Sequence, residues 1–311
     1  MDFKPSLLAD LGATNARFAI TEDGLSYHNP KELKISEYNS MHDLCIGYLL
    51  SIKSTNIRRA FIGLAAPVIG DVITFVNCDL EFSQSELQSS LFPDGLKVVN
   101  DLALQAHAVN LLEEDELETI GQNFSDAEGP KVLVMPGTGL GMAGIVNEEV
   151  VSTEAGHLNI PAKLKKESLD KIIEVFRRQS GRMPTFEDLL SGKGLNFFYC
   201  VLSDQDKCSL TNEEILLNYN TDAICLEVKE NMNYLFAAYL RYIALAWGAL
   251  GGVYLAGSIT NSLLFDIDNS KFRQIFEDSE TMKSLLKAIP IFRVKPEDLG
   301  FRGALKLARE L

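Results

Sequence analysis

Two short glycine-containing bends carry groups suited to phosphate chemistry. Residues 10–15 read Asp-Leu-Gly-Ala-Thr-Asn and residues 137–141 read Gly-Thr-Gly-Leu-Gly, each between apolar runs. One such bend alone is more often an ordinary strand-end bulge. Two bends, each with a threonine beside a small residue, favour phosphate binding through backbone N–H groups and the hydroxyls of Thr14 and Thr138. Asp10 supplies the hard oxygen ligand that Mg²⁺ on a nucleotide needs, directly or through water.

Two other nucleotide motifs are absent from the sequence. No Walker pattern G-x-x-x-x-G-K-[ST] occurs. No G-x-G-x-x-G opens a helix after the first apolar run, and GTGLGMAG continues into the strand-like segment 142–146. We therefore expect neither a P-loop nor a Rossmann cofactor site.

Asn100 and Asp101 lie where a short apolar run meets a segment of helical spacing. Either side chain could simply cap the helix by accepting from its free N–H groups. A carboxylate here could instead act as the general base for a substrate hydroxyl. The two roles can also be divided, with Asn100 capping or positioning and Asp101 reacting.

Glu154 and His157 lie three residues apart around Ala155 and Gly156, in a segment too short for a helix. The small residues permit close backbone approach. A carboxylate with an imidazole suits polyol hydroxyls, whereas a solvated surface loop is the plainer interpretation. A metal site built on His157 has no obvious partners, since the chain holds four histidines.

The elements that must position these groups follow from patterning. Residues 6–20 predict a hairpin, as do residues 128–146. The remaining strands are expected as pieces within 58–77, at 96–100 and, buried, in 251–257. Helices are expected over 101–112, over most of 163–247 and, closing the chain, over 299–311. Thr185 is placed as an N-cap. The pattern changes near residue 110.

Composition limits the size, partners and compartment of the protein. A chain of 311 residues favours two lobes over one. A net charge of −14 disfavours nucleic acid or an anionic membrane as partner. The start resembles no signal peptide and no long apolar stretch predicts a membrane span. The five cysteines form no C-x-x-C pair, so we expect neither disulfides nor structural zinc, and a cytoplasmic protein.

Seven segments, in order, resemble the bacterial glucokinase family of the actin-like ATPase and sugar-kinase superfamily. They are DLGATNARFAI, GLAAPVIGDVITFVNCDLEFS, VVNDLALQAHAV, PGTGLGMAGIV, TEAGHLNIPA, FEDLLSGKGL and GGVYLAGSI, and they span nearly the whole chain. The resemblance implies a two-lobed α/β fold of the actin-like ATPase (ribonuclease H-like) type, with a mixed five-stranded sheet and flanking helices in each lobe and a cleft between lobes. A small domain would comprise 1–109 plus 297–311, and a large domain 110–296.

The same resemblance implies the reaction and its residues. The reaction would be transfer of the γ-phosphoryl group of Mg-ATP to the 6-hydroxyl of D-glucose, with ATP and Mg²⁺ as cofactors, sugar and nucleotide as partners, and a homodimer as the assembly. Asp101 would be the catalytic base, and the sugar would be bound by Asn100, Asp101, Glu154, His157 and Glu187. The nucleotide would be bound by Asp10, Gly12, Ala13, Thr14, Asn15, Arg17, Gly137, Thr138, Gly139 and Gly257, with Asp10 orienting Mg²⁺.

Departures from the family pattern are few. Ala13, Met135-Pro136, Ala155, Asn159 and Ser258 replace residues that are usual there, and Lys193 stands where proline is common and has no assigned role. No sugar-binding or catalytic side chain is lost. Two other functions remain as alternatives. One is a kinase of another hexose or an N-acetyl hexosamine, although the cysteine-rich zinc motif of the latter is absent. The other is a catalytically silent sugar-binding regulator.

Overall fold

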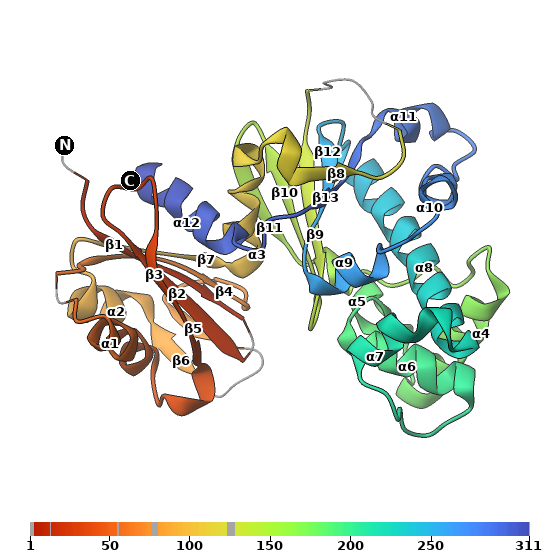
Figure 1. Ribbon diagram of the computed structural model, residues 1–311, viewed down its shortest axis with the longest axis horizontal. Coiled ribbons are helices and arrows are strands. Elements are labelled where there is room, and N and C mark those ends of the chain that lie inside the picture. Colours follow the sequence, from red (N-terminus) through yellow and green to blue (C-terminus); the bar gives the residue numbers. More distant parts are fainter. Residues whose placement is uncertain (1–2, 13, 55, 76–79, 123–127, 311) are drawn as a thin grey trace. The chain divides into compact units, whose positions relative to one another are not determined.

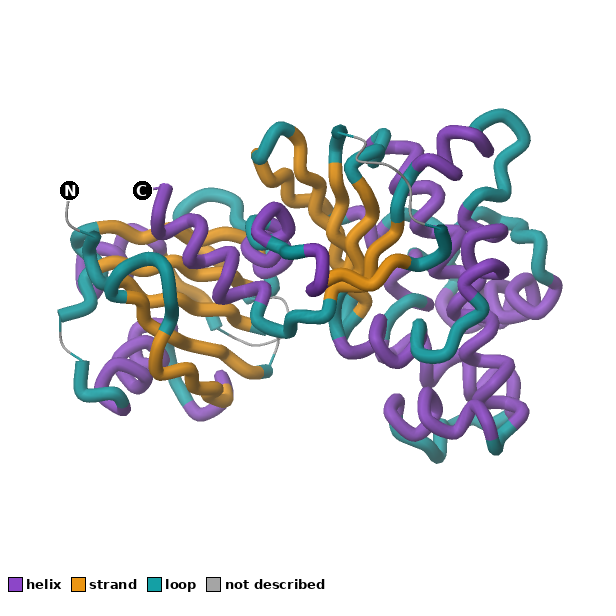
Figure 2. The backbone as a smooth tube through the Cα atoms, turned by 45° about the horizontal axis from the view of Figure 1, so that its top comes forward, coloured by secondary structure: helices purple, strands orange, loops and turns teal. Residues whose placement is uncertain are grey.

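The computed structural model describes residues 3–12, 14–54, 56–75, 80–122 and 128–310. The chain forms two compact units (Figure 1), unit 1 being residues 1–112 with 298–311 and unit 2 being residues 113–297. In Figure 2 each unit has a layer of strands with helices beside it. None of the helices in the described ranges is long and apolar enough to span a bilayer.

Unit 1 is built on a five-stranded mixed sheet in the order β3-β2-β1-β4-β7. Strand β1 pairs antiparallel with β2 and parallel with β4, and β4 pairs parallel with β7. Its strands are β1 (Ser6–Leu11), β2 (Asn15–Thr21), β3 (His28–Lys34), β4 (Arg59–Leu64), β7 (Gly95–Asn100) and the separate pair β5 (Val72–Thr74) and β6 (Glu81–Ser83). Its helices are α1 (Met41–Ser51), α2 (Gln84–Leu91), α3 (Asp101–Ala106) and α12 (Leu299–Glu310).

Strand β1 is buried on both faces because helices cover both sides of the sheet. Leu7 and Ala9 belong to the same core as residues of α1 and α2. Leu8 packs instead with residues of α3 and α12, as the alternation of a strand requires. The closing helix thus returns to the unit in which the chain begins.

Two glycines fix the position of α3. A Cβ on Gly63 of β4 would lie 2.6 Å from Leu104 Cδ2, and a Cβ on Gly303 of α12 would collide with the Leu104 carbonyl oxygen. Helix α3 therefore packs closely between β4 and α12, and its first turn is held in place. The helix expected over 101–112 ends at Ala106, because the following N–H groups form tighter bonds to carbonyls three residues back.

Unit 2 repeats this strand arrangement in the order β11-β10-β9-β12-β13 and adds β8 at the edge. The pairings are again antiparallel, antiparallel, parallel and parallel. Its strands are β8 (Leu117–Thr119), β9 (Lys131–Pro136), β10 (Leu140–Val146), β11 (Glu149–Thr153), β12 (Gly252–Leu255) and β13 (Ile291–Val294). Its helices are α4 (Glu167–Ser180), α5 (Phe186–Leu189), α6 (Gly192–Ser203), α7 (Asn212–Leu217), α8 (Ala223–Trp247), α9 (Ser258–Leu263), α10 (Asn269–Phe276) and α11 (Lys283–Ala288).

The prediction of a five-stranded sheet in each unit is therefore correct for unit 1. Unit 2 has six strands in its sheet, one more than predicted. The sixth strand, β8, pairs antiparallel with β13. Its three residues carry no clear alternation in the sequence and become a strand only because β13 offers an open edge.

Candidate functional site

The first glycine-containing bend joins β1 to β2. The Gly12 N–H donates to the Asn15 carbonyl at 3.0 Å, which closes the turn. The side chains of Asn15 and Arg17 both contact Glu32 on β3, at 2.8 and 3.2 Å. Thr14 is exposed, and Ala13 lies outside the described residues. The bend thus presents Gly12 and Thr14, while Asn15 and Arg17 are held to the neighbouring strand.

Asp10 lies one residue before the end of β1, half-buried against the first turn of α12. A Cβ on Gly300 would lie 2.6 Å from Asp10 Cγ, so only glycine leaves room for this carboxylate. Burial, and secondarily the charge of Asp101, raises the pKa of Asp10 to about 7, while Arg17 opposes the shift.

The two carboxylates suit a divalent cation. Asp10 and Asp101 repel each other in a poorly solvated place, and a cation would relieve that repulsion. No cluster of three or more His, Cys, Asp or Glu side chains that could hold a metal occurs in the part of the chain that the structure describes. Mg²⁺ fits such a sparse site because it keeps several waters and uses one or two carboxylates together with substrate phosphates.

Asn100 and Asp101 occupy the junction of β7 and α3. Asn100 Oδ1 accepts from the N–H groups of Leu102 and Ala103 at 3.0 and 3.1 Å, so Asn100 is the N-cap of the helix. Asp101 Oδ1 accepts from the Leu102 N–H at 2.8 Å. The capping role weighed for Asn100 is therefore present, and Asp101 is fixed beside it.

The second bend joins β9 to β10 in unit 2. The Gly137 N–H donates to the Gly139 carbonyl at 2.7 Å, and the Gly192 N–H of α6 donates to the Gly137 carbonyl at 3.0 Å. Gly257, with a φ of 94°, lies against the bend, since a Cβ added at this position would be 3.3 Å from the Pro136 carbonyl oxygen. Thr138 is exposed at the tip.

Glu154, His157 and Glu187 gather close to this second bend. His157 Nε2 lies 3.9 Å from Glu154 Oε2 and 3.8 Å from Glu187 Oε1. Glu187 Oε2 accepts from the Leu140 N–H at 2.9 Å. The three side chains form a cluster of two carboxylates and an imidazole, with acceptors and donors suited to hydroxyl groups.

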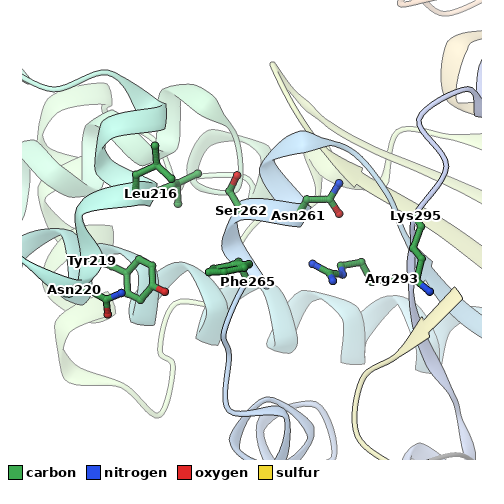
Figure 3. A pocket seen from close by; sticks show the side chains of 9 residues that line it. Leu216, Tyr219, Asn220, Asn261, Ser262, Phe265, Arg293 and Lys295 are labelled. Atoms are coloured by element: carbon green, nitrogen blue, oxygen red, sulfur yellow. The ribbon is translucent and has the colours of Figure 1, made fainter. Parts of the chain in front are cut away.

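A pocket lies beyond Gly257, along α9 (Figure 3). It has a volume of about 580 Å³, within the usual range for small-molecule sites. Figure 3 shows the rings of Tyr219 and Phe265 on one side and Arg293 toward the other end. Lys229 donates to the Phe265 carbonyl at 2.7 Å and its ammonium lies 3.4 Å from the Tyr219 ring centre, so one buried lysine fixes two walls.

Sequence patterning did not predict three features of the site: the pocket along α9, the room that Gly300 leaves for Asp10, and the bond from the Leu140 N–H to Glu187. Gly300 and Gly303 stand three apart in the closing helix, and such a pair of glycines in a helix could have indicated close packing on one face. The partner of Gly300 lies near the other end of the chain, however, and spacing alone does not identify it.

The sequence matches known proteins over nearly its full length. A family model described as Glucokinase matches residues 7–311. A glucokinase of Neisseria gonorrhoeae (strain ATCC 700825 / FA 1090) is 31% identical over 310 residues, which cover 96% of this chain and 93% of that protein.

Solved structures share the fold. A glucokinase from Balamuthia mandrillaris in complex with glucose has a TM-score of 0.81 at 22% identity, covering 99% of this chain and 94% of that one. A ROK family glucokinase from Streptomyces griseus in complex with glucose and AMPPNP has a TM-score of 0.67 at 15% identity, covering 99% and 100%. The fold is the α/β actin-like ATPase fold expected from the sequence.

Proposed function

This chain belongs to the glucokinase family, and from that premise we propose that it is an ATP-dependent glucokinase. It transfers the γ-phosphoryl group of ATP to the 6-hydroxyl of D-glucose and releases glucose 6-phosphate and ADP. The observation that carries the proposal is the cluster of Glu154, His157 and Glu187, which lies against the glycine-containing bend at residues 137–139. Groups for hydroxyls and groups for phosphates therefore adjoin within one unit.

Each residue group has a role in this reaction. Asp101 accepts the proton of the 6-hydroxyl, and Asn100 offers its side-chain N–H groups to a neighbouring hydroxyl. Glu154, His157 and Glu187 bind further hydroxyls. Mg²⁺, held through Asp10, would neutralise charge on the phosphates. Catalysis then rests mainly on positioning and on charge neutralisation.

The nucleotide follows the second bend and α9. Gly137, Thr138 and Gly139 would bind the phosphates, and Gly257 would contact the ribose. Gly12 and Thr14 of the first bend belong to the same proposed set of nucleotide-binding residues. The adenine enters the pocket between Tyr219 and Asn261. This pocket lies along α9, the helix that begins directly after Gly257. The AMPPNP bound by the Streptomyces griseus protein supports ATP as the donor.

We propose a small domain of residues 1–109 with 297–311 and a large domain of 110–296. We further propose a cytoplasmic enzyme, with the homodimer as the assembly to test by light scattering.

The direct test is phosphorylation of glucose, mannose, fructose and N-acetylglucosamine with ATP, with Mg²⁺ and with EDTA. We expect Mg²⁺-dependent turnover on glucose, and weak turnover on sugars that leave the polar cluster unpaired. A preference for another sugar would replace glucose as the substrate. Glucose binding without turnover would instead support the sugar-binding regulator.

Asp101→Asn should keep sugar binding and lose most turnover, because the amide cannot accept the proton. We expect kcat to fall by about 10²–10⁴-fold, the usual contribution of a general base. The glucose Kd, measured by calorimetry, should change little. Near-normal turnover would remove Asp101 from the role of base.

Gly300→Ala should weaken the response to Mg²⁺, because the new methyl group displaces the Asp10 carboxylate. The Mg²⁺ concentration for half-maximal rate should rise about five- to tenfold, equivalent to roughly 1 kcal/mol. Lys306→Ala truncates a side chain on the same helix and is the control. An unchanged Mg²⁺ midpoint in Gly300→Ala would argue against Asp10 as the metal residue.

Ser262→Tyr should fill the pocket on α9 and exclude adenine. We expect the ATP KM to rise about tenfold or more and the glucose KM to change less than twofold, as steady-state kinetics would show. Ser270→Tyr, at an exposed position of α10, is the matched control. Equal effects of the two substitutions would place the adenine elsewhere.

A further inference from the structure

We propose that Glu187 positions the second phosphate bend as well as binding sugar, so that the sugar cluster and the nucleotide bend form one hydrogen-bonded structure. This proposal rests on the proposed function, since it gives Glu187 a second role within that site. Its consequence is that a sugar-binding side chain sets nucleotide affinity even when no sugar is present.

The two oxygens of the Glu187 carboxylate face different partners. Oε2 accepts from the Leu140 N–H at 2.9 Å, immediately after the bend at residues 137–139. Oε1 lies 3.8 Å from His157 Nε2, on the side of the sugar cluster. A sugar hydroxyl can thus meet one oxygen while the other keeps the bend in place.

Leu140 is held on both sides of its backbone. Its N–H is bonded to Glu187, and its carbonyl oxygen lies against Gly156, where any Cβ would collide with it. Gly156 lies in the same short segment as Glu154 and His157. Both segments that supply sugar-binding side chains therefore contact this one residue of the second hairpin.

The approach of Glu187 to the bend leaves no spare room. A Cβ on Gly139 would lie 2.5 Å from Glu187 Oε2, so the carboxylate occupies the place that a side chain would take. At Gly137, two residues earlier, a Cβ would meet nothing within 4 Å. The bend therefore has one glycine crowded by Glu187 and one that is open, which provides a matched pair of positions.

Helix α5 keeps Glu187 in this place. Thr185 and Asp188 form a capping box, and Arg182 donates to both oxygens of Asp188 at 2.6 and 2.8 Å. The Phe186 N–H donates to the Leu158 carbonyl at 2.9 Å, and its ring packs on buried Tyr239 with ring centres 4.8 Å apart. The short helix is thus anchored to the sugar-binding segment and to α8.

The first experiment measures AMPPNP binding with Mg²⁺ and no sugar, by calorimetry, in wild type and three variants. Glu187→Ala should weaken binding about tenfold, because the Leu140 N–H loses its acceptor and the bend loosens. Glu187→Gln keeps an acceptor oxygen and should stay within about threefold of wild type, while its glucose KM rises. His157→Ala is the control: it should raise the glucose KM and leave AMPPNP binding within about twofold.

The second experiment tests the reverse direction, with glucose binding measured in the absence of nucleotide. Gly139→Ala should displace the Glu187 carboxylate and weaken glucose binding about fivefold or more. Gly137→Ala should leave the glucose Kd unchanged, since its methyl group meets open space. Because neither substitution lies within α5 and both leave the Glu187 side chain in place, this pair also tests the proposal if Glu187→Ala fails to fold.

The outcomes distinguish failure of the positioning role of Glu187 from failure of the proposed glucokinase function. Wild-type protein that binds AMPPNP and glucose, with Glu187→Ala at wild-type AMPPNP affinity, overturns the positioning role and leaves the proposed function intact. Equal glucose affinities for Gly139→Ala and Gly137→Ala have the same meaning. Wild-type protein that binds neither ligand overturns the proposed function and this inference with it.

Discussion

The parallel pairing of β1 with β4, and of β9 with β12, is the constraint on which the rest of the structure depends. Parallel strands end at the same edge of their sheet, and the loops beyond that edge are where α/β proteins bind ligands. In unit 1 this edge receives the first bend and, through β7, the Asn100–Asp101 junction. In unit 2 it receives the second bend and Gly257. Within each unit these groups lie at one edge because the strand pairing of its sheet requires it, although they are far apart in sequence.

The net charge of −14 makes the reliance on backbone groups understandable. At the first bend Arg17 is engaged by Glu32, and the second bend itself contains glycines and a threonine. N–H groups and hydroxyls bind phosphate at short range without altering the charge of the whole surface. A metal ion on the proposed nucleotide would complete this arrangement, since it would also compensate the repulsion between Asp10 and Asp101.

Sequence patterning was sufficient for features that depend on local periodicity or on capping chemistry. The two hairpins, the closing helix and the caps at Asn100 and Thr185 all follow from residues next to each other in the chain. The site required more: Gly300 touches Asp10 from the opposite end of the sequence, and Glu187 reaches Leu140 across 47 residues. These contacts depend on how closely two backbones approach, which composition and spacing do not encode. Strand β8 was missed for a related reason, because its partner edge, and not its own residues, makes it a strand.

The glycines of the second hairpin region show how closely its neighbouring segments pack. Gly139 admits the Glu187 carboxylate, Gly156 admits the Leu140 carbonyl, and Gly257 admits the end of β9. Each has a different neighbour, so each would resist substitution for a different steric reason. Together they allow three separate segments to approach one bend closely, and one of these segments supplies the Glu187 carboxylate that accepts from the Leu140 N–H. In its proposed sugar-binding role, a carboxylate held in this way would not adjust to a sugar without moving the bend, because a short helix with its own capping box restrains it from behind. Stiffness in α5 is therefore what would make sugar and phosphate positions interdependent.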